Sequence, residues 1–540
     1  MPSLHLCVFV AAHLVAWELA GVSVVEDRVA ALQNAGAAAL FGDARRGVEK
    51  ECLRVTPEGY IAATSHPERL GSALTHRFIT TDFSEALLEF VTPPLDSTWE
   101  VIQFLCDLHQ FAGDALDDEL LWAMSMPCMI RSDDDIPLAR YGSSNVAQMK
   151  TIYRRGLGYR YGRYMQAISG IHYNYSLPDG VWPLLRELLE SRDGIAGFRS
   201  EMYFGLVRNV RRLDWLLLYL FGASPAVCKS FLRDLDVGLE EFDRGTFYGP
   251  FATSLRMSDL GYQNKNQASL RVSANNLEEY VRDLDGAIRT PNDDYAALGL
   301  IVDGEYRQLS TNLLQIENEY YSTIRPKRVA NSGERPTAAL TRAGVEYVEL
   351  RALDVSPFDP IGINRRTAGF LEIFLVYCLL TESPPAGPDE YQHNAANHLD
   401  VARRGREPGL ALRRSGGGVA LADWGAELLD GMQAVAELMD PDGDRGYRDA
   451  LRVQRAAVEN PGLTPSARLL DDLRQTGLPL FTYAMDLSRR YRDYFASLDA
   501  GDNPRLDMLR AESEESLARQ RRIETEDRLS FDEYLAAYYR

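Results

Sequence analysis

Acidic residues lie inside several short segments that have the two-residue alternation of β-strands. In the segment 47–53, Glu49 and Glu51 are two residues apart, so a strand places both carboxylates on one face. Other segments of this kind supply further polar residues, which are Asp82 and Glu89, His172 with Asn174, Gln315 with Glu317 and Glu319, and Glu349 with Arg351. Apolar neighbours in each segment predict burial of the opposite face.

Two carboxylates on one strand face repel each other unless a cation lies between them. A hard divalent cation is the natural partner, and Mg²⁺ or Mn²⁺ fits these oxygen ligands better than Zn²⁺. A single Glu-x-Glu pair is more often a solvated strand face, and a lone histidine such as His172 is more often a satisfied core residue. Repetition of the pattern in one chain favours a metal site with positions open to phosphate oxygens.

Basic residues could complete a site for phosphate or carboxylate. Arg256, Arg325, Lys327 and Arg328 are candidates, because arginine binds both anions through paired hydrogen bonds. Each such cluster, taken alone, is more often a surface ion pair. The basic and aromatic run 153–164 could stack on nucleic-acid bases. The net charge of −20, however, repels phosphate backbones and anionic lipids, so we expect no nucleic-acid or membrane partner.

Common nucleotide-binding and hydrolase motifs are absent from the sequence. It contains no GxxxxGK[ST] loop, no GxGxxG fingerprint, no HExxH and no GxSxG. A nucleotide would therefore be held by metals on carboxylates and by separate arginine and lysine side chains. Catalysis would consist of positioning and charge neutralisation, as phosphoryl transfer requires.

Apolar periodicity predicts an α+β fold with a large, mostly antiparallel sheet. We expect strands at 47–55, 86–92, 168–177, 309–318 and 344–353, and helices at 24–40, 100–116, 143–161, 201–220, 276–288 and 366–380. A proline-rich break at 383–388 precedes a mainly helical region, with a flexible loop at 415–418. The expected parts are an apolar extension at 1–23, a core at 24–383 and a helical C-terminal region at 384–540 packed on the core.

The six cysteines are widely spread and form no C-x-x-C pair. This spacing argues against a disulfide scaffold or a thiolate metal site and suits the reducing cytoplasm. The apolar stretch 1–22 has no basic residue ahead of it, so we do not interpret it as an export signal. The apolar run 215–228 is too short to span a bilayer and is expected in the core.

Two long motifs carry a resemblance to a known family. They are GSALTH at 71–76, followed by TTDF at 80–83, and LQIENE at 314–319. The chain resembles the proteobacterial-type glutamate–cysteine ligases, which belong to the glutamine-synthetase-like carboxylate–amine ligases. The resemblance runs from about residue 25 to the C-terminal end and weakens after about residue 384. It implies a funnel-like antiparallel sheet lined with carboxylates, with ATP and Mg²⁺ inside.

The resemblance also implies roles for individual residues. The family's metal ligands match Glu49, Glu51, Asp82, Glu89, His172 and Glu349. Its cysteine-site residues match Phe83, Tyr153, Leu157, Gln166, Ile168, Arg256, Tyr262 and Tyr321. Arg351 matches an arginine expected near the transferred phosphate or the glutamate, and Arg325 and Lys327 are candidates for nucleotide binding. We expect one metal group on Glu49, Asp82 and Glu349, and another on Glu51, Glu89 and His172.

The activity implied by the resemblance is the first step of glutathione synthesis. ATP would phosphorylate the γ-carboxylate of L-glutamate, and the amine of L-cysteine would displace phosphate to give γ-glutamylcysteine. The expected partners are these three small molecules, and the expected state is a monomer or weak homo-oligomer. One alternative is a related ligase with another acceptor amine. A second is a non-catalytic nucleotide-binding relative, which the presence of all six expected metal ligands disfavours.

Overall fold

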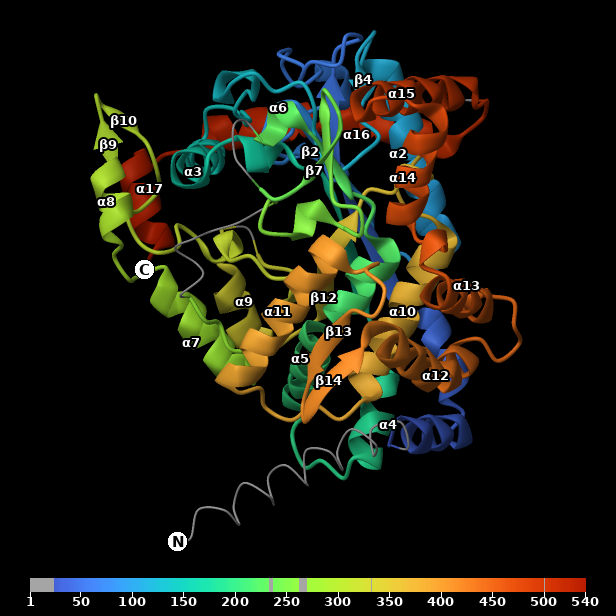
Figure 1. Cartoon of the computed structure of the whole chain (residues 1–540). Coiled ribbons are helices and arrows are strands. Elements are labelled where there is room, and N and C mark those ends of the chain that lie inside the picture. Colours follow the sequence, from blue (N-terminus) through green and yellow to red (C-terminus); the bar gives the residue numbers. More distant parts are fainter. Residues whose placement is uncertain (1–23, 233–236, 262–269, 332, 500) are drawn as a thin grey trace, which may run out of the picture.

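The computed structural model describes residues 24–232, 237–261, 270–331, 333–499 and 501–540. Tyr262 and the expected extension at 1–23 lie outside these ranges. Within them, helices surround a central sheet of seven strands, and the last helices return to the side of the molecule that carries α3 (Figure 1). No helix in these ranges is both long and apolar enough to cross a membrane.

The central sheet is antiparallel at every printed strand pair, which confirms the expected α+β class with an antiparallel sheet. Its strands in spatial order are β11 (Ile324–Lys327), β12 (Tyr347–Asp354), β5 (Gly170–Ser176), β1 (Arg45–Val55), β3 (Leu87–Val91) and β2 (Ile79–Thr81), and β4 (Leu120–Leu121) pairs with the end of β1. Four of the five expected strands are therefore present as β1, β3, β5 and β12.

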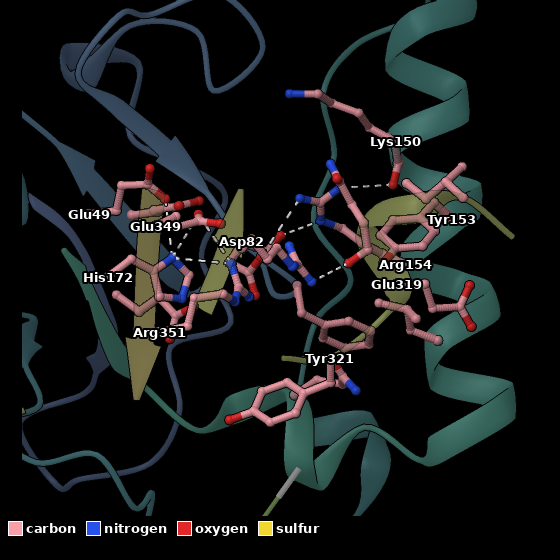
Figure 2. Close-up of a pocket in the computed structure, with 18 of the residues that line it drawn as sticks. Glu49, Asp82, Lys150, Tyr153, Arg154, His172, Glu319, Tyr321, Glu349 and Arg351 are labelled. Atoms are coloured by element: carbon pink, nitrogen blue, oxygen red, sulfur yellow. Dashed lines mark hydrogen bonds and ion pairs between the residues drawn. The ribbon is translucent and has the colours of Figure 1, made fainter. Parts of the chain in front are cut away.

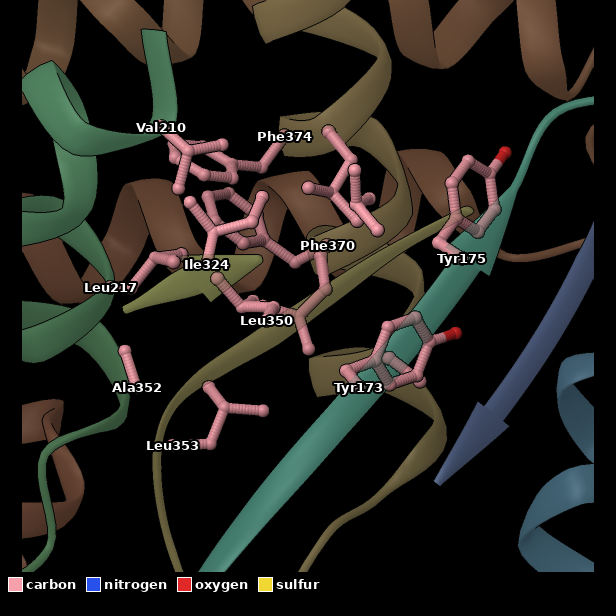
Figure 3. Packing of buried hydrophobic residues seen from close by; sticks show 14 of the residues in the cluster. Tyr173, Tyr175, Val210, Leu217, Ile324, Leu350, Ala352, Leu353, Phe370 and Phe374 are labelled. Carbon is pink, nitrogen blue, oxygen red and sulfur yellow. The ribbon is translucent and has the colours of Figure 1, made fainter. Parts of the chain in front are cut away.

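One face of the sheet is covered by two long apolar helices, α5 (Ile195–Phe221) and α10 (Arg365–Leu380). Figure 3 shows Val210 of α5 beside Phe374 of α10, and Phe370 of α10 beside Leu350 of β12, with Tyr173 of β5 in the same layer. These side chains are fully buried, so this layer is the main core. The expected core run 215–228 is buried, which confirms that interpretation, with 215–221 in this layer and 226–228 in a second apolar cluster.

The remaining helices and strands before residue 384 are short or peripheral, apart from α2 and α3. The helices are α2 (Thr98–Ala115), α3 (Asn145–Tyr161), α4 (Val181–Leu188), α6 (Lys229–Leu232), α7 (Leu277–Ala287), α8 (Asp293–Leu298) and α9 (Pro336–Ala343). The small sheets are β6 (Ala226–Cys228), β8 (Thr246–Tyr248) and β7 (Glu240–Asp243), and the pair β9 (Ile301–Val302) and β10 (Glu305–Tyr306). The expected helix at 24–40 is helical only to residue 34 and continues as a 3-10 turn, Ala37–Asp43.

The chain after residue 384 is mainly helical, as expected. It contains α11 (Pro388–Arg404), α12 (Leu421–Met439), α13 (Tyr447–Glu459), α14 (Pro465–Thr476), α15 (Leu480–Ser497), α16 (Pro504–Glu526) and α17 (Phe531–Tyr538). The expected flexible loop at 415–418 is instead part of a hairpin formed by β13 (Ala411–Arg414) and β14 (Gly417–Ala420). Positive φ angles at Gly416 and Gly417 allow this reversal, so the glycines mark a turn.

Helix α16 packs against the loop that contains the GSALTH motif. The backbone N–H of Ser72 donates to Oγ of Ser516 at 2.9 Å, and Arg77 forms an ion pair of 2.7 Å with the buried Glu512. Gly71 has a φ of +76°, and a Cβ there would lie 2.4 Å from Oγ of Ser516. Glycine is therefore required both for the turn and for the close approach of α16.

The expected strand at 309–318 is wrong. This segment is irregular and ends in the 3-10 turn Glu317–Glu319. Side-chain hydrogen bonds replace a strand ladder, since Glu319 accepts from Arg160 at 3.0 Å and from the backbone N–H of Gln315 at 2.7 Å. Glu317 accepts from Arg335 at 2.7 Å. Consequently Gln315, Glu317 and Glu319 do not align on one strand face.

The interpretation of the cysteines also requires a correction. Cys128 and Cys228 form a disulfide, with Cα atoms 5.4 Å apart and a sequence separation of 100 residues. Both lie in the same buried apolar cluster, where folding brings them together. Sequence spacing cannot reveal such a pair, because the two cysteines meet only through tertiary packing.

Candidate active site

The site is built on the sheet face opposite the apolar core. In the antiparallel register Glu51 of β1 lies opposite Glu89 of β3, and Glu49 of β1 lies opposite His172 of β5. Glu349 of β12 lies opposite Asn174 of β5. Because alternate side chains share a face, this register assembles a row of polar groups across four strands. The strand pattern in the sequence predicted which residues of one strand share a face, such as Glu49 and Glu51, but not the order of the strands.

Glu49, His172 and Glu349 form the first cluster in this row (Figure 2). Nδ1 of His172 lies 3.2 Å from Oε2 of Glu49 and 3.6 Å from Oε1 of Glu349. Asn174 donates from Nδ2 to Oε1 of Glu49 at 2.8 Å. Burial and the charge of Arg351 lower the pKa of His172, so its ring is neutral near pH 7 and can donate a lone pair to a metal.

Cations hold the two carboxylates of this cluster in the charged form. Nζ of Lys327 lies 3.3 Å from Oε2 of Glu349, and Nη1 of Arg351 lies 3.2 Å from Oε1 of Glu349. Burial alone raises the pKa of Glu349, but Lys327 and Arg351 outweigh burial and bring the pKa well below its usual value. Burial and the charge of Glu349 likewise raise the pKa of Glu49. The hydrogen bond with His172 counteracts both, and the pKa of Glu49 is below its usual value.

Glu51, Glu89 and Asp82 form the second cluster. Oε2 of Glu51 accepts from the backbone N–H of Gly170 at 2.6 Å. Burial and the charge of Asp82 raise the pKa of Glu51 to about 8. Burial and the charge of Glu49 raise the pKa of Glu89 well above its usual value. The geometry thus differs from the expected division at His172, which lies with Glu49 and Glu349. Asp82 is grouped with Glu51 and Glu89 through charge interactions, since its charge raises the pKa of both.

These residues fit a divalent cation. One ligand atom from each of Glu49, His172 and Glu349 can lie within 4.8 Å of the others, close to the separation of about 4 Å across a Mg²⁺ ion. Among the described residues, Oε2 of Glu349 is buried and receives no hydrogen bond. The ion pair with Lys327 at that oxygen is longer than a good hydrogen bond, so the atom remains open to a metal.

A cavity of about 490 Å³ lies over both clusters, and its lining tests the positions of the expected site residues. All six expected metal ligands line it, as do Arg351, Arg325 and Lys327. The expected cysteine-site residues that line it are Phe83, Tyr153, Leu157, Gln166, Ile168, Arg256 and Tyr321. The structure therefore brings together every expected site residue that it describes.

Arg256 lies near the Glu51 end of the cavity and is held by buried polar groups. Its Nη1 lies 3.6 Å from Oδ1 of Asp354, which also accepts from Ser254 at 2.9 Å. A Cβ on Gly170 would lie 2.0 Å from Nη2 of Arg256, so only glycine allows the guanidinium to cross β5 there. Tyr321 donates to Sδ of Met257 at 3.2 Å beside this arginine.

Sequence reasoning missed several residues of the cavity wall. One face of α3 lines it, and on this face the missed residues Val146, Met149, Lys150 and Arg154 lie at helical spacing beside the expected Tyr153 and Leu157. Burial lowers the pKa of Lys150 to about 8, and Arg154 forms an ion pair of 4.0 Å with Asp82. Helical periodicity could have placed this face beside Tyr153. Tyr534 and Tyr538 of α17, by contrast, carry no signal that connects them with residues almost 400 positions earlier.

A row of carboxylates and cations lines a cavity on the antiparallel sheet, which is the arrangement expected of a carboxylate–amine ligase, and comparison with known proteins gives the family. The model of the glutamate–cysteine ligase family matches residues 29–401, and the chain belongs to this family. The chain is 50% identical over 525 residues to the glutamate–cysteine ligase of Alcanivorax borkumensis, covering 95% of this chain and 99% of the relative. It is 49% identical to that of Azotobacter vinelandii, covering 95% and 97%.

Solved structures agree with this assignment. The glutamate–cysteine ligase of Francisella tularensis, solved in complex with AMP, is 40% identical with a TM-score of 0.87, and the match covers 92% of this chain and 97% of that chain. A bifunctional glutathione synthetase from Pasteurella multocida is 24% identical with a TM-score of 0.67, over 86% of this chain and 54% of that one. The second likeness concerns the fold alone.

Proposed function

We propose that this protein joins the γ-carboxylate of L-glutamate to the amine of L-cysteine at the expense of ATP. The products are γ-glutamylcysteine, ADP and phosphate, and the reaction is the first step of glutathione synthesis. The observation that carries this proposal is the convergence of Glu49, His172 and Glu349 with Lys327 and Arg351 in one cavity of a chain that belongs to the glutamate–cysteine ligase family.

Two sets of side chains would hold magnesium, or manganese, in this site. The first set is Glu49, His172 and Glu349, and the second is Glu51, Asp82 and Glu89. The metal, when bound, neutralises charge on the phosphate oxygens during transfer. Relief of repulsion between these buried carboxylates supports the assignment, because burial and neighbouring acids raise the pKa of Glu51 and Glu89 in the metal-free chain.

The cationic residues would orient the transferred phosphoryl group. Arg351 lies on β12 two residues after Glu349 and is fixed by that carboxylate, which places its guanidinium beside the first metal set. Arg325 and Lys327 lie on β11, next to β12, and extend the line of positive charge. Their positions support a reaction in which the γ-carboxylate of glutamate takes the phosphoryl group from ATP. Pre-oriented cations act strongly here because the site is buried.

The cysteine amine would then attack the acyl carbon of γ-glutamyl phosphate, and phosphate would leave. Arg256, Tyr153 and Tyr321 would orient the cysteine, with Phe83, Leu157, Gln166 and Ile168 around it. The proximity of Phe83 to α3 supports this grouping, because a Cβ on Gly158 would lie 3.5 Å from the Phe83 ring. Tyr262 keeps this role as a prediction from the sequence, as it lies outside the described residues.

We also propose that the enzyme works in the cytoplasm as a monomer or weak homo-oligomer, with a core at 24–383 and a helical region at 384–540. The proline-rich stretch 383–388 supports the boundary between the two parts.

A panel of acceptor amines tests the substrate assignment. Purified protein is supplied with ATP, Mg²⁺ and glutamate, and with cysteine, 2-aminobutyrate or alanine, and each product is identified by mass spectrometry. The proposal expects kcat/KM to be highest for cysteine. Equal turnover of the three amines would contradict the cysteine assignment and leave a ligase with a broader acceptor site.

A further inference from the structure

The cavity has two chemically different ends, and α3 runs between them. Leu157 of α3 lies at the end that contains Phe83, Gln166 and Arg256. Val146 is three helical turns away, roughly 16 Å along the axis. Ligands of different chemistry can therefore occupy the two ends of one cavity.

The end near Val146 consists mainly of aromatic and apolar side chains, with Lys150 one helical turn away. Its lining includes Val146 and Met149 of α3, Ile316, and Tyr534 and Tyr538 of α17. Tyr534 and Tyr538 are four residues apart on one helix and therefore share a face. Both are half-buried and line the cavity, so their rings contribute to its wall. The charged face of the sheet, with Glu49 and its partners, belongs to the other part of the cavity.

We propose that α17 closes the nucleotide end of the cavity and that Tyr534 and Tyr538 pack against the purine base of ATP. This inference rests on the proposed use of ATP. Glutamate and cysteine are small zwitterions, whose charged groups are best bound beside the carboxylates and arginines of the sheet. ATP alone among the three substrates carries a planar ring that gains by leaving water for an aromatic wall.

The chain between the two ends supports this placement of the base. Lys327, which contacts Glu349, is followed by Gly333 and Glu334, and both of these line the cavity. Phosphates held beside Lys327 would leave the base to extend along this segment. The segment continues to Arg335, which binds Glu317, and burial together with the charge of Glu317 raises the pKa of Tyr538. Lys327, Gly333, Glu334 and the tyrosines of α17 thus line one cavity.

Helix α17 is held firmly enough to provide a preformed surface. Tyr539 donates to the backbone oxygen of Gln315 at 2.7 Å, and the ring of Phe531 packs edge-to-face on Tyr306 at 5.2 Å. Asn145, the first residue of α3, donates to Asp527 at 2.7 Å. Side chains that are ordered before binding lose little further freedom when the ligand arrives.

The test measures binding of AMP and of inorganic tripolyphosphate with Mg²⁺ to the full-length protein by calorimetry. Tyr538→Leu keeps apolar volume but removes the aromatic face, whereas Tyr538→Phe keeps that face. The inference expects Tyr538→Leu to weaken AMP binding roughly 5- to 150-fold, the range for loss of an aromatic stacking partner. Tripolyphosphate affinity should not change, and Tyr538→Phe should bind AMP as the parent does.

Tyr494→Leu is a matched control, because this tyrosine is 44% exposed on α15 and does not line the cavity. The inference would be overturned if AMP affinity stayed unchanged both in Tyr538→Leu and in the double variant Tyr534→Leu/Tyr538→Leu. A parent protein that binds no AMP would also overturn it. Equal losses of AMP and tripolyphosphate affinity would also overturn it, because they would indicate a general loss of structure. A parent that binds AMP but makes no γ-glutamylcysteine would contradict the proposed function and leave this comparison valid.

Discussion

Glu51 on β1 lies directly opposite Glu89 on β3 in the antiparallel ladder. Like charges in directly opposed positions destabilise a sheet. Burial and neighbouring carboxylates raise the pKa of both groups, to about 8 for Glu51. A pair that is unfavourable for the folded chain alone becomes favourable when a divalent cation lies between the two carboxylates, so this relationship is a strong structural argument for metal binding.

Metal binding should release protons at neutral pH. With its pKa raised to about 8, Glu51 holds a proton below that pH in the metal-free protein, and a cation binds only the carboxylate. The apparent Mg²⁺ affinity should therefore increase as the pH rises toward 8, and the part of the proton release that comes from Glu51 should disappear above it. Calorimetry in buffers of different ionisation enthalpy measures the release. Glu51→Gln should release fewer protons, and an unchanged release in that variant would contradict the assignment.

Glu49→Gln should retain the fold and lose most of the ligase activity. Glutamine keeps the size of the side chain but cannot neutralise a cation, so we expect kcat to fall about 100-fold or more. Circular dichroism verifies the fold, and ADP release measures the rate. Glu346→Gln is the matched control, because Glu346 is 41% exposed and pairs with Arg328 outside the cavity lining. Turnover of Glu49→Gln like that of the parent would show that Glu49 is not a metal ligand.

Arg256→Ala should raise the KM for cysteine more than the KM for ATP. A charged hydrogen bond contributes about 1.5–3 kcal/mol, which corresponds to roughly a 10- to 150-fold loss of affinity. Tyr262→Ala should act in the same direction. Arg366→Ala, which removes an arginine that is 60% exposed and paired with Asp449, serves as control. Equal changes in the two KM values would argue against a cysteine site at Arg256.

Glu512→Ala should loosen the attachment of α16 to the GSALTH loop. The Glu512 side chain is fully buried and accepts from Arg77 at 2.8 Å and from the backbone N–H of Arg77 at 3.0 Å. Loss of these bonds should lower the free energy of unfolding by about 1.5–3 kcal/mol. Urea unfolding measures it, with Glu515→Ala as control because Glu515 is 61% exposed. A change no larger than that of the control would show that the contact contributes little.

The same contact should depend on pH. Burial raises the pKa of Glu512, but the hydrogen bonds from Arg77 and Arg519 outweigh burial and bring it below the usual value. A lowered carboxyl pKa stabilises the folded state above the pKa of the unfolded chain, and this stabilisation is lost as the pH falls through the folded pKa. The difference in stability between the parent and Glu512→Ala should therefore shrink in acid. A difference that stays constant down to low pH would contradict this explanation.

Local patterns predicted the strands that carry the site. Alternation located Glu49 and Glu51 on β1 and Glu349 on β12, because β1 must bury its other face against α2 and β12 must bury its other face against α5. The same reasoning failed at 309–318, where hydrogen bonds from Arg160 and Arg335 hold an irregular backbone. Long-range side-chain contacts of this kind leave no periodic signal.

The partition of the six expected metal ligands depends on strand order. His172 joins Glu49 because β5 lies between β1 and β12, and no property of the separate segments determines that order. The GSALTH motif raises a related problem. Its glycine is needed for the approach of α16, over 400 residues later, so the motif was recognisable while its structural reason was not. The contribution of α17 to the cavity could not be predicted for the same reason, because α17 is far from the other lining residues in the sequence.

The most direct test of the account is ADP release by the purified protein with ATP and Mg²⁺, with glutamate and cysteine added separately and together. The account predicts release that requires both amino acids, with γ-glutamylcysteine as the product in mass spectrometry. Absence of ADP release with both amino acids present would contradict the proposed activity.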